Sequence, residues 1–421
     1  MLNKLKHSSF YYFIACLSIV IGLVFQDFHK IPLTGGIIVL GLIWLGTLKF
    51  KEKFKTLRKN YFALSFITFY LLHLTSLLYS ANTPVAQSDL ELKVTLLLLP
   101  IFMFSTLLFS QQRKIVLLNI FAISMACMAV YDFYYSFLEY TNGANISVFY
   151  YKNLPHLLVG KPHYLAWYYS FAMFIALRQL LVVKRQKIVW LIVFSILFLS
   201  LILLSSRAYL FAFIFVFIVS YILWLSKNRR SITSILKLII PLAAIISIVL
   251  IIPNTRSRII DTYAEINKLF DKDEHRQTNP RVYIWKYAAE LIVDKPLLGY
   301  GVGDAKDELT NSLKNCEALF WDGEKNVPLN RKSLNYHNQF LQSLAEVGIL
   351  GFLLLLFLMI APFFLKNKHP LFLIFVGLTL IGFLTESMLE RQAGVVMLAF
   401  MFPLLASLNV DEIEGSNRNK K

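Results

Sequence analysis

Apolar and polar positions alternate along this chain in long blocks. Runs of about twenty predominantly apolar residues recur through most of the sequence, and short basic segments separate them. A run of that length crosses the hydrocarbon core of a bilayer as a helix, so the pattern predicts an all-α integral membrane protein with about twelve transmembrane helices. The expected spans are residues 8–26, 31–48, 61–79, 94–110, 114–137, 163–182, 187–205, 207–226, 233–252, 338–364, 369–386 and 392–410.

Composition and charge agree with this class. Hydrophobic residues make up 57% of the 421 and charged residues only 16%, whereas soluble domains carry about 25% charged residues. A net charge of +17 would point to nucleic-acid binding in a soluble protein, but cytoplasmic loops of membrane proteins are enriched in Lys and Arg. Because the basic clusters fall in alternate loops, we expect both termini in the cytoplasm. We read the first apolar run as an uncleaved span, since no small-residue cleavage site follows it.

One long hydrophilic segment, residues 253–337, interrupts the apolar pattern. It carries thirteen basic and thirteen acidic residues, and long loops are translocated largely regardless of charge. Its stretch VYIWKYAAELI has helical apolar spacing and ends at Pro296. We therefore predict a partly helical extracytoplasmic subdomain at 253–337. It separates an N-terminal bundle of about nine helices (1–252) from about three C-terminal helices and a basic cytoplasmic tail (338–421).

Ionisable residues at the edges of the spans are candidates for function, because a charge near hydrocarbon is costly. Arg207 follows two serines between two spans, with no other charge from Lys187 to Lys227. It either snorkels to the interface or binds an anionic head group through its paired donors. Lys93 and His163 each stand at the start of a span. An interface anchor is the plainer role for the lysine, and a helix-start residue for the histidine.

Polar residues also gather near two other predicted outer ends. A local salt bridge is the simplest explanation for Glu386, Glu390 and Arg391 in TESMLERQAG. His337 and Asn338 stand where the long loop meets the next span. Histidine has a reference pKa near neutrality and is the usual side chain for taking a proton from a hydroxyl, although a cap or packed polar group is the commoner role for one histidine.

Short motifs elsewhere imply no cofactor. GYGVGD at 299–304 lacks the strand before it and the GK[ST] after it that a phosphate loop needs, so we predict a turn. Asp271 and Asp273 match a DxD pattern, which is expected by chance in so acidic a loop. Neither ATP nor a metal is implied. The chain has three cysteines, Cys16, Cys127 and Cys316. They are too few for a disulfide framework or a cysteine-rich zinc site.

Three segments together resemble the O-antigen ligase family, whose superfamily also holds O-antigen polymerases and bacterial protein O-oligosaccharyltransferases. They resemble the family's Ser-x-Arg span start, its Arg-x-x-x-Trp helix with a Pro-Leu-x-Gly-x-Gly turn, and its His-Asn element ending in Glu-x-Gly. They occur in the family's order around one large loop. The segments are SSRAYLFAFIFVF at 205–217, NPRVYIWKYAAELIVDKPLLGYGVGD at 279–304 and YHNQFLQSLAEVGILGFLLLL at 336–356.

The resemblance implies a glycosyltransferase that moves a glycan from undecaprenyl pyrophosphate to an acceptor hydroxyl at the periplasmic face of the bacterial inner membrane. It implies an inverting, metal-independent reaction without a cofactor. His337 would activate the hydroxyl, and cations would neutralise the leaving diphosphate. The residues expected to bind diphosphate are Arg207, Arg281 and Lys93, and the supporting candidates are Asn338, His163 and Glu346.

The acceptor stays open at this point. Lipid A–core would make the protein an O-antigen ligase, which the single large loop favours. A growing glycan repeat would make it a polymerase, and a Ser or Thr side chain a protein transferase. A different class, a flippase for polyprenyl-linked glycans, would place charges at the bilayer midplane and show repeated halves. We expect membrane lipids as further partners and no nucleic acid.

Overall fold

The computed structural model describes residues 2–25, 31–106, 110–156, 162–183, 185–227, 256, 260, 280–315, 319–321, 326–328, 335–366 and 368–408. The predicted span at 233–252, Asp271, Asp273, Cys316 and the predicted basic tail lie outside these ranges.

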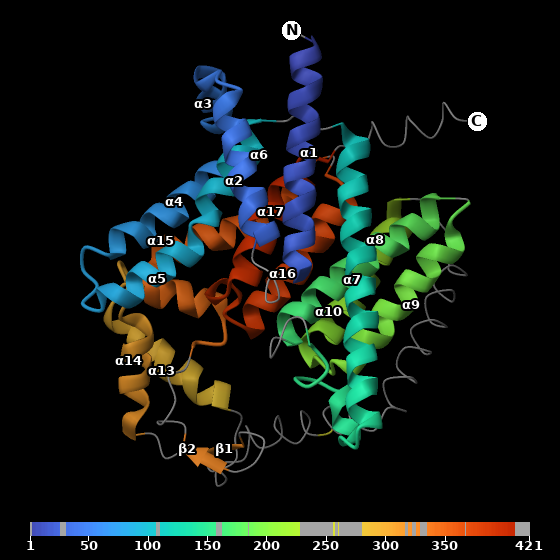
Figure 1. The fold of residues 1–421 in the computed structure, drawn as a ribbon. Coiled ribbons are helices and arrows are strands. Elements are labelled where there is room, and N and C mark those ends of the chain that lie inside the picture. The colour runs from blue at the N-terminus through green and yellow to red at the C-terminus, as the bar shows by residue number, and fades with distance from the viewer. Residues whose placement is uncertain are drawn as a thin grey trace.

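Helices make up nearly all of the described structure (Figure 1). The first half of the chain holds α1 (Leu2–Phe25), α2 (Ile31–Gly46), α3 (Phe50–Leu57), α4 (Tyr61–Ser76), α5 (Thr83–Lys93), α6 (Thr95–Ser105), α7 (Gln111–Thr141), η1 (Ile146–Phe149), α8 (Pro162–Val182), α9 (Lys187–Leu203) and α10 (Arg207–Lys227). The second half holds α13 (Pro280–Asp294), α14 (Ala305–Ser312), η2 (Leu313–Asn315), α15 (Gln339–Ile360), η4 (Ala361–Phe364), α16 (Pro370–Thr385), η5 (Met388–Glu390) and α17 (Gln392–Ala406). Strands β1 (Leu319–Trp321) and β2 (Asn326–Pro328) pair antiparallel, with Phe320 opposite Val327.

The predicted class, an all-α membrane protein, is supported. Three of the described helices are long and apolar enough to cross a bilayer, namely α7, α8 and the continuous α15–η4, and the bent pair α2–α3 makes a fourth if it counts as one span. Shorter apolar helices coincide with most other predicted spans. The total of twelve spans therefore stays a prediction.

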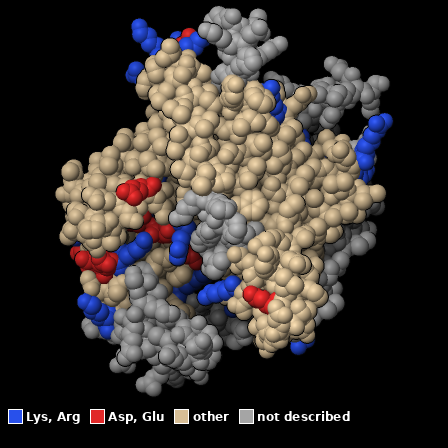
Figure 2. All heavy atoms as spheres, in the orientation of Figure 1, with Lys and Arg blue, Asp and Glu red and all other residues tan. Residues whose placement is uncertain are grey.

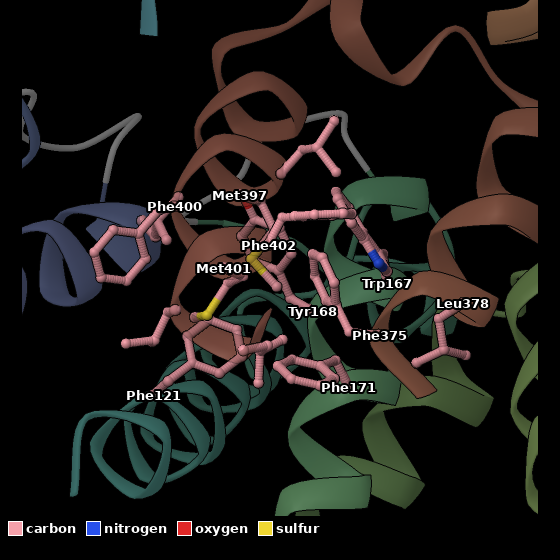
Figure 3. Close-up of a cluster of buried hydrophobic side chains, with 14 of the residues drawn as sticks. Phe121, Trp167, Tyr168, Phe171, Phe375, Leu378, Met397, Phe400, Met401 and Phe402 are labelled. Carbon is pink, nitrogen blue, oxygen red and sulfur yellow. The ribbon is translucent and has the colours of Figure 1, made fainter. Parts of the chain in front are cut away.

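The core is built around α17, whose residues 393–406 are all buried. A helix that is apolar on every side belongs in a protein core or in a membrane, and the burial of α17 shows that other helices surround it. Figure 3 shows its Met401 and Phe402 beside aromatic rings of α7, α8 and α16. The ring of Trp167 stacks on Phe375 with the centroids 5.7 Å apart, one of the offset arrangements that aromatic pairs prefer.

The molecule has two distinct ends (Figure 1). Helix α3 and the beginning of α1 lie at one end, and α13, α14 and the β1–β2 pair lie at the other. Between them, much of the visible surface is free of charged side chains, as Figure 2 shows by its broad tan region. Large apolar side chains of the helices are exposed, among them Leu42 at 62%, Leu191 at 54% and Phe133 at 44%. Such a surface is suited to lipid.

Helix α15 is interrupted at Val347 and Gly348, although the sequence predicts an unbroken span over 338–364. Gly348 has a φ of 67°, a conformation that side chains other than glycine rarely adopt. The break removes the normal intrahelical partners of nearby carbonyl groups, and another segment has to supply donors.

The predicted turn after α13 supplies these donors. Gly299 and Gly301 have φ values of 68° and 91°, which bring the turn backbone close to α15. A Cβ atom on Gly348 would overlap the backbone of Leu297, so the two segments fit only with glycine here. The hydrogen bonds between them run from Tyr300 N to Ala345 O (2.7 Å), from Gly301 N to Glu346 O (3.0 Å) and from Ile349 N to Pro296 O (2.9 Å).

The same turn is fixed on its other side to the connection between α4 and α5. The carboxylate of Asp304 accepts hydrogen bonds from Ala81 N at 2.7 Å and Asn82 N at 2.8 Å. The hydroxyl of Tyr79 donates to Leu298 O at 2.8 Å. Helix α13 is thus anchored to the helical bundle through hydrogen bonds of the turn that follows its C-terminal end.

Candidate functional site

His337 and Arg281, which come from two different motifs, both contact Glu386. The Nδ1 atom of His337 lies 3.1 and 3.0 Å from the two Glu386 carboxylate oxygens. The Nη2 atom of Arg281 is 3.7 Å from Oε2, and Asn335 donates to Oε1 at 3.2 Å. The histidine side chain keeps 30% of its surface exposed and the glutamate 10%, so a reactant can reach the imidazole while the carboxylate is largely covered.

Glu386 stays ionised over the whole neutral range. Burial raises the pKa of its carboxyl, but the hydrogen bond and charge of His337 and the charges of His163 and Arg281 outweigh burial and lower the pKa to about 2. The residue directly follows α16. A fixed negative charge here orients the imidazole.

The backbone of His337 is held in an uncommon conformation, with a φ of 46°. Such strain persists only where surrounding contacts enforce it, and it is concentrated at functional sites. His337 N donates to Asn335 Oδ1 at 3.2 Å, and further contacts fall on the preceding residue. Trp285 of α13 donates from Nε1 to Tyr336 O at 3.0 Å, and the Tyr336 hydroxyl donates to Ala305 O at 2.7 Å. The Arg-x-x-x-Trp motif thus contributes both a charge near His337 and a tether for its backbone.

The beginning of α8 lies beside the same carboxylate. His163 is the second residue of α8, and its charge contributes to the lowered pKa of Glu386. The next residue, Tyr164, donates to Ser387 O at 3.4 Å. His163 therefore joins the group around Glu386.

Arg207 is brought to this end of the molecule by the antiparallel packing of α10 on α16. Tyr209 packs on Gly382 so closely that a side chain at this glycine would not fit, and Val216 contacts Gly377. Since α10 begins at Arg207 and α16 ends just before Glu386, the arginine stands beside the end of α16.

Asn338 has a structural role. Its Oδ1 accepts hydrogen bonds from Phe340 N at 2.9 Å and Leu341 N at 3.1 Å, which makes it the N-cap of α15. Its Nδ2 donates to Leu384 O at 3.3 Å. The cap therefore also joins the start of α15 to the end of α16, next to His337.

Lys93 is found in a second, more deeply buried charged cluster. Its side chain is 1% exposed, and Nζ lies 2.8 Å from Asp89, 2.9 Å from Glu346 and 3.3 Å from Glu390. The sequence predicted an interface anchor or a diphosphate ligand here. Three carboxylates already surround the ammonium group, so its charge is offset inside the protein, and this arrangement does not favour either role.

The remaining members of this cluster extend it across several helices. Lys306 of α14 pairs with Glu390, His73 of α4 lies 3.4 Å from Glu346, and Gln342 donates to Glu346. Within the described ranges, one set of acidic groups could hold a metal ion: Asp89, Glu346 and Glu390, whose oxygens lie within 4.8 Å of one another. The Lys93 ammonium group contacts all three and supplies the cation itself.

Sequence reasoning missed the role of Glu386. The salt bridge expected within TESMLERQAG is not the contact that the structure gives to Glu386 or Glu390, because these acids face His337 and Lys93 instead. The two glutamates are four residues apart, yet the chain turns through η5, which ends at Glu390, and each glutamate enters a different cluster. The available signal was an acidic residue directly after a charge-free apolar span, which is costly without a partner.

Comparison with known proteins adds independent evidence. Residues 191–356 match the family model described as O-Antigen ligase. A protein of Rickettsia typhi named "putative polysaccharide ligase" is 34% identical over 179 residues, which cover 40% of this chain and 42% of that protein. Proteins with that name in Rickettsia conorii and Rickettsia felis are 38% and 40% identical over 87 residues, which cover 21% of this chain and 19% of each relative.

These matched segments span less than half of the length of the relatives. The family match contains all three motifs that carry the resemblance, at 205–217, 279–304 and 336–356. The resemblance drawn from the sequence is thereby confirmed: residues 191–356 of this chain match the O-antigen ligase family model.

Proposed function

We propose that this protein is a membrane glycosyltransferase that moves a glycan from undecaprenyl pyrophosphate to an acceptor hydroxyl at the periplasmic face of the bacterial inner membrane. Its preferred acceptor would be lipid A–core, as in O-antigen ligation. The support is the family match over 191–356 and the group of His337, Arg281 and Glu386 at one end of an apolar helical bundle.

The proposed reaction is a direct displacement. The acceptor oxygen forms a bond to the anomeric carbon as the bond from that carbon to the diphosphate oxygen breaks, which inverts the configuration. The electron pair leaves with undecaprenyl pyrophosphate. The hydroxyl proton passes to Nε2 of His337, because the Nδ1–H of the neutral imidazole donates to Glu386 and leaves the lone pair on Nε2.

Arginines would stabilise the charge that develops on the leaving diphosphate. Arg281 at the start of α13 and Arg207 at the start of α10 supply planar donor pairs that match phosphate oxygens. Lys93 takes a different role in this proposal. It holds Glu346 and Glu390 in place. Glu390 is the last residue of η5, and Glu386 lies just before η5, so Lys93 supports the segment that positions Glu386. The single observation that carries the proposal is the contact of His337 Nδ1 with Glu386.

Replacing Glu386 with glutamine is expected to lower kcat on the order of 100-fold, with little change in KM. An amide cannot stabilise the positive charge that the imidazole gains when it accepts the proton, and it orients the ring less well. Glu386→Asp should recover part of this loss because it keeps the charge. The measurement is transfer by purified protein over a range of donor concentrations. Glu91→Gln removes an exposed carboxylate and serves as the matched control. Equal kcat values for Glu386→Gln and wild type would refute the positioning role.

The acceptor can be identified in a host that lacks its own O-antigen ligase and makes the lipid-linked donor. We expect wild-type protein to attach polysaccharide to lipid A–core, seen as a ladder on a silver-stained gel. Longer glycan on the polyprenyl carrier would instead indicate a polymerase, and a glycosylated protein would indicate a protein transferase. Donor that only changes sides of the membrane would indicate a flippase. Verified expression without any of these products would overturn the proposal.

A further inference from the structure

A cavity lies far from His337, where the beginning of α4 meets the end of α15. It has a volume of about 830 Å³ and is open on one side, a size in the range of about 300–1,000 Å³ that is usual for small-molecule sites. Lys55 and Lys59 border it from α3 and the segment after it, and Lys368 borders it from the connection between η4 and α16. No acidic residue is among its lining residues.

The floor of this cavity is apolar and mainly aromatic. The side chains come from the start of α4 and from the end of α15 and η4, and they are Tyr61, Phe62, Phe357, Phe364 and Leu365. Phe364 is 81% exposed and Tyr61 is 74% exposed. The cavity therefore combines three ammonium groups with an apolar surface that is open at the edge of the bundle, so a free inorganic anion would leave most of it unused.

Helix α3 is fixed in the orientation that forms one wall. It bends by 115° from α2, as an amphipathic helix does when it lies along a membrane surface. Lys53 holds the bend, because its buried Nζ donates to Trp44 O and lies 4.4 Å from the centre of the Trp44 ring. Lys55 is exposed, and Figure 2 shows Lys and Arg side chains projecting at the α3 end of the molecule.

Lys368 is also held in position. Its Nζ donates to Ala406 O at the end of α17, at 3.1 Å. An ammonium group has three donors, so this bond leaves donors for a ligand. The end of α17, the beginning of α4 and the end of α15 meet around the cavity, and a ligand bound there would join three parts of the bundle.

The geometry points to a binding site for one anionic phospholipid, with the phosphate head group on Lys55, Lys59 and Lys368 and the acyl chains on the aromatic floor. Basic pockets between transmembrane helices bind anionic head groups on the cytoplasmic side of membranes, which is the side that the sequence predicts for these lysines. This inference does not depend on the proposed function, because the site is at the opposite end of α15 from His337.

In the test, phosphatidylglycerol, phosphatidylcholine or inorganic phosphate is added to purified full-length protein in neutral detergent, and the three effects are compared. Thermal unfolding and native mass spectrometry report binding. We expect phosphatidylglycerol alone to raise Tm and to remain bound as one molecule. The triple variant Lys55→Gln, Lys59→Gln, Lys368→Gln should bind it on the order of 100-fold more weakly.

A matched triple variant removes three charges near the same end that do not line the cavity: Lys51→Gln, Arg58→Gln and Lys366→Gln, all exposed. It should bind like wild type. Equal losses in the two triple variants would mean diffuse attraction, and equal effects of inorganic phosphate would mean an anion site without a lipid; either result overturns the inference. If the cavity triple does not fold, Ala361→Trp, which fills the floor and keeps the lysines, should abolish binding, and unchanged binding would refute the site.

Discussion

Replacing His337 with alanine is expected to lower glycan transfer by about 100-fold or more, the usual contribution of a positioned acid–base group. The reason is that alanine leaves the acceptor hydroxyl without a proton acceptor, while Glu386 and Arg281 remain as a pair. The measurement is the initial rate of transfer by purified protein from a lipid-linked donor. Alanine keeps the Cβ atom and therefore leaves the strained backbone of residue 337, with its φ of 46°, as it is.

His337→Gln separates the chemical role of the imidazole from its structural role. Glutamine can still donate a hydrogen bond to Glu386, but it has no basic nitrogen. Both variants should therefore be equally inactive and should keep a Tm close to that of wild type. Transfer by His337→Gln at a near wild-type rate would show that the residue positions its neighbours and that another group accepts the proton.

Replacing Lys93 with methionine is expected to destabilise the fold by about 3–5 kcal/mol, which is the cost of breaking a buried ion pair by removing one partner. Asp89, Glu346 and Glu390 would lose the ammonium group that all three contact. Thermal unfolding in detergent measures the effect as a fall in Tm on the order of 10 °C. Lys49→Met, which breaks the exposed pair with Glu52, should change Tm very little.

The same variant tests the sequence-based prediction that Lys93 binds diphosphate. A ligand role predicts a higher KM for the donor with an unchanged Tm, whereas the buried cluster predicts a lower Tm. Adding Glu390→Gln to Lys93→Met should restore part of the lost stability, because residues within one charged network are energetically coupled. An additive loss in the double variant would contradict the network.

The sequence by itself determined the membrane class, the approximate places of the described apolar helices and the resemblance to the O-antigen ligase family. These features depend on local composition averaged over about twenty residues, because the transfer of apolar surface out of water is non-directional. The motifs also indicated His337, Arg281 and a turn at 299–304. That turn is present, with Gly299 and Gly301 at positive φ.

Only the tertiary structure decided which charges meet. His337 and Glu386 are 49 residues apart in the sequence, and Lys93 and Glu390 are 297 apart. The break in α15 at Gly348 likewise depends on the turn of residues 296–301, which supplies the donors. Hydrogen bonds and ion pairs are short-ranged and directional, so the partner of each buried charge is fixed by how the helices pack, and hydropathy contains no information about that packing.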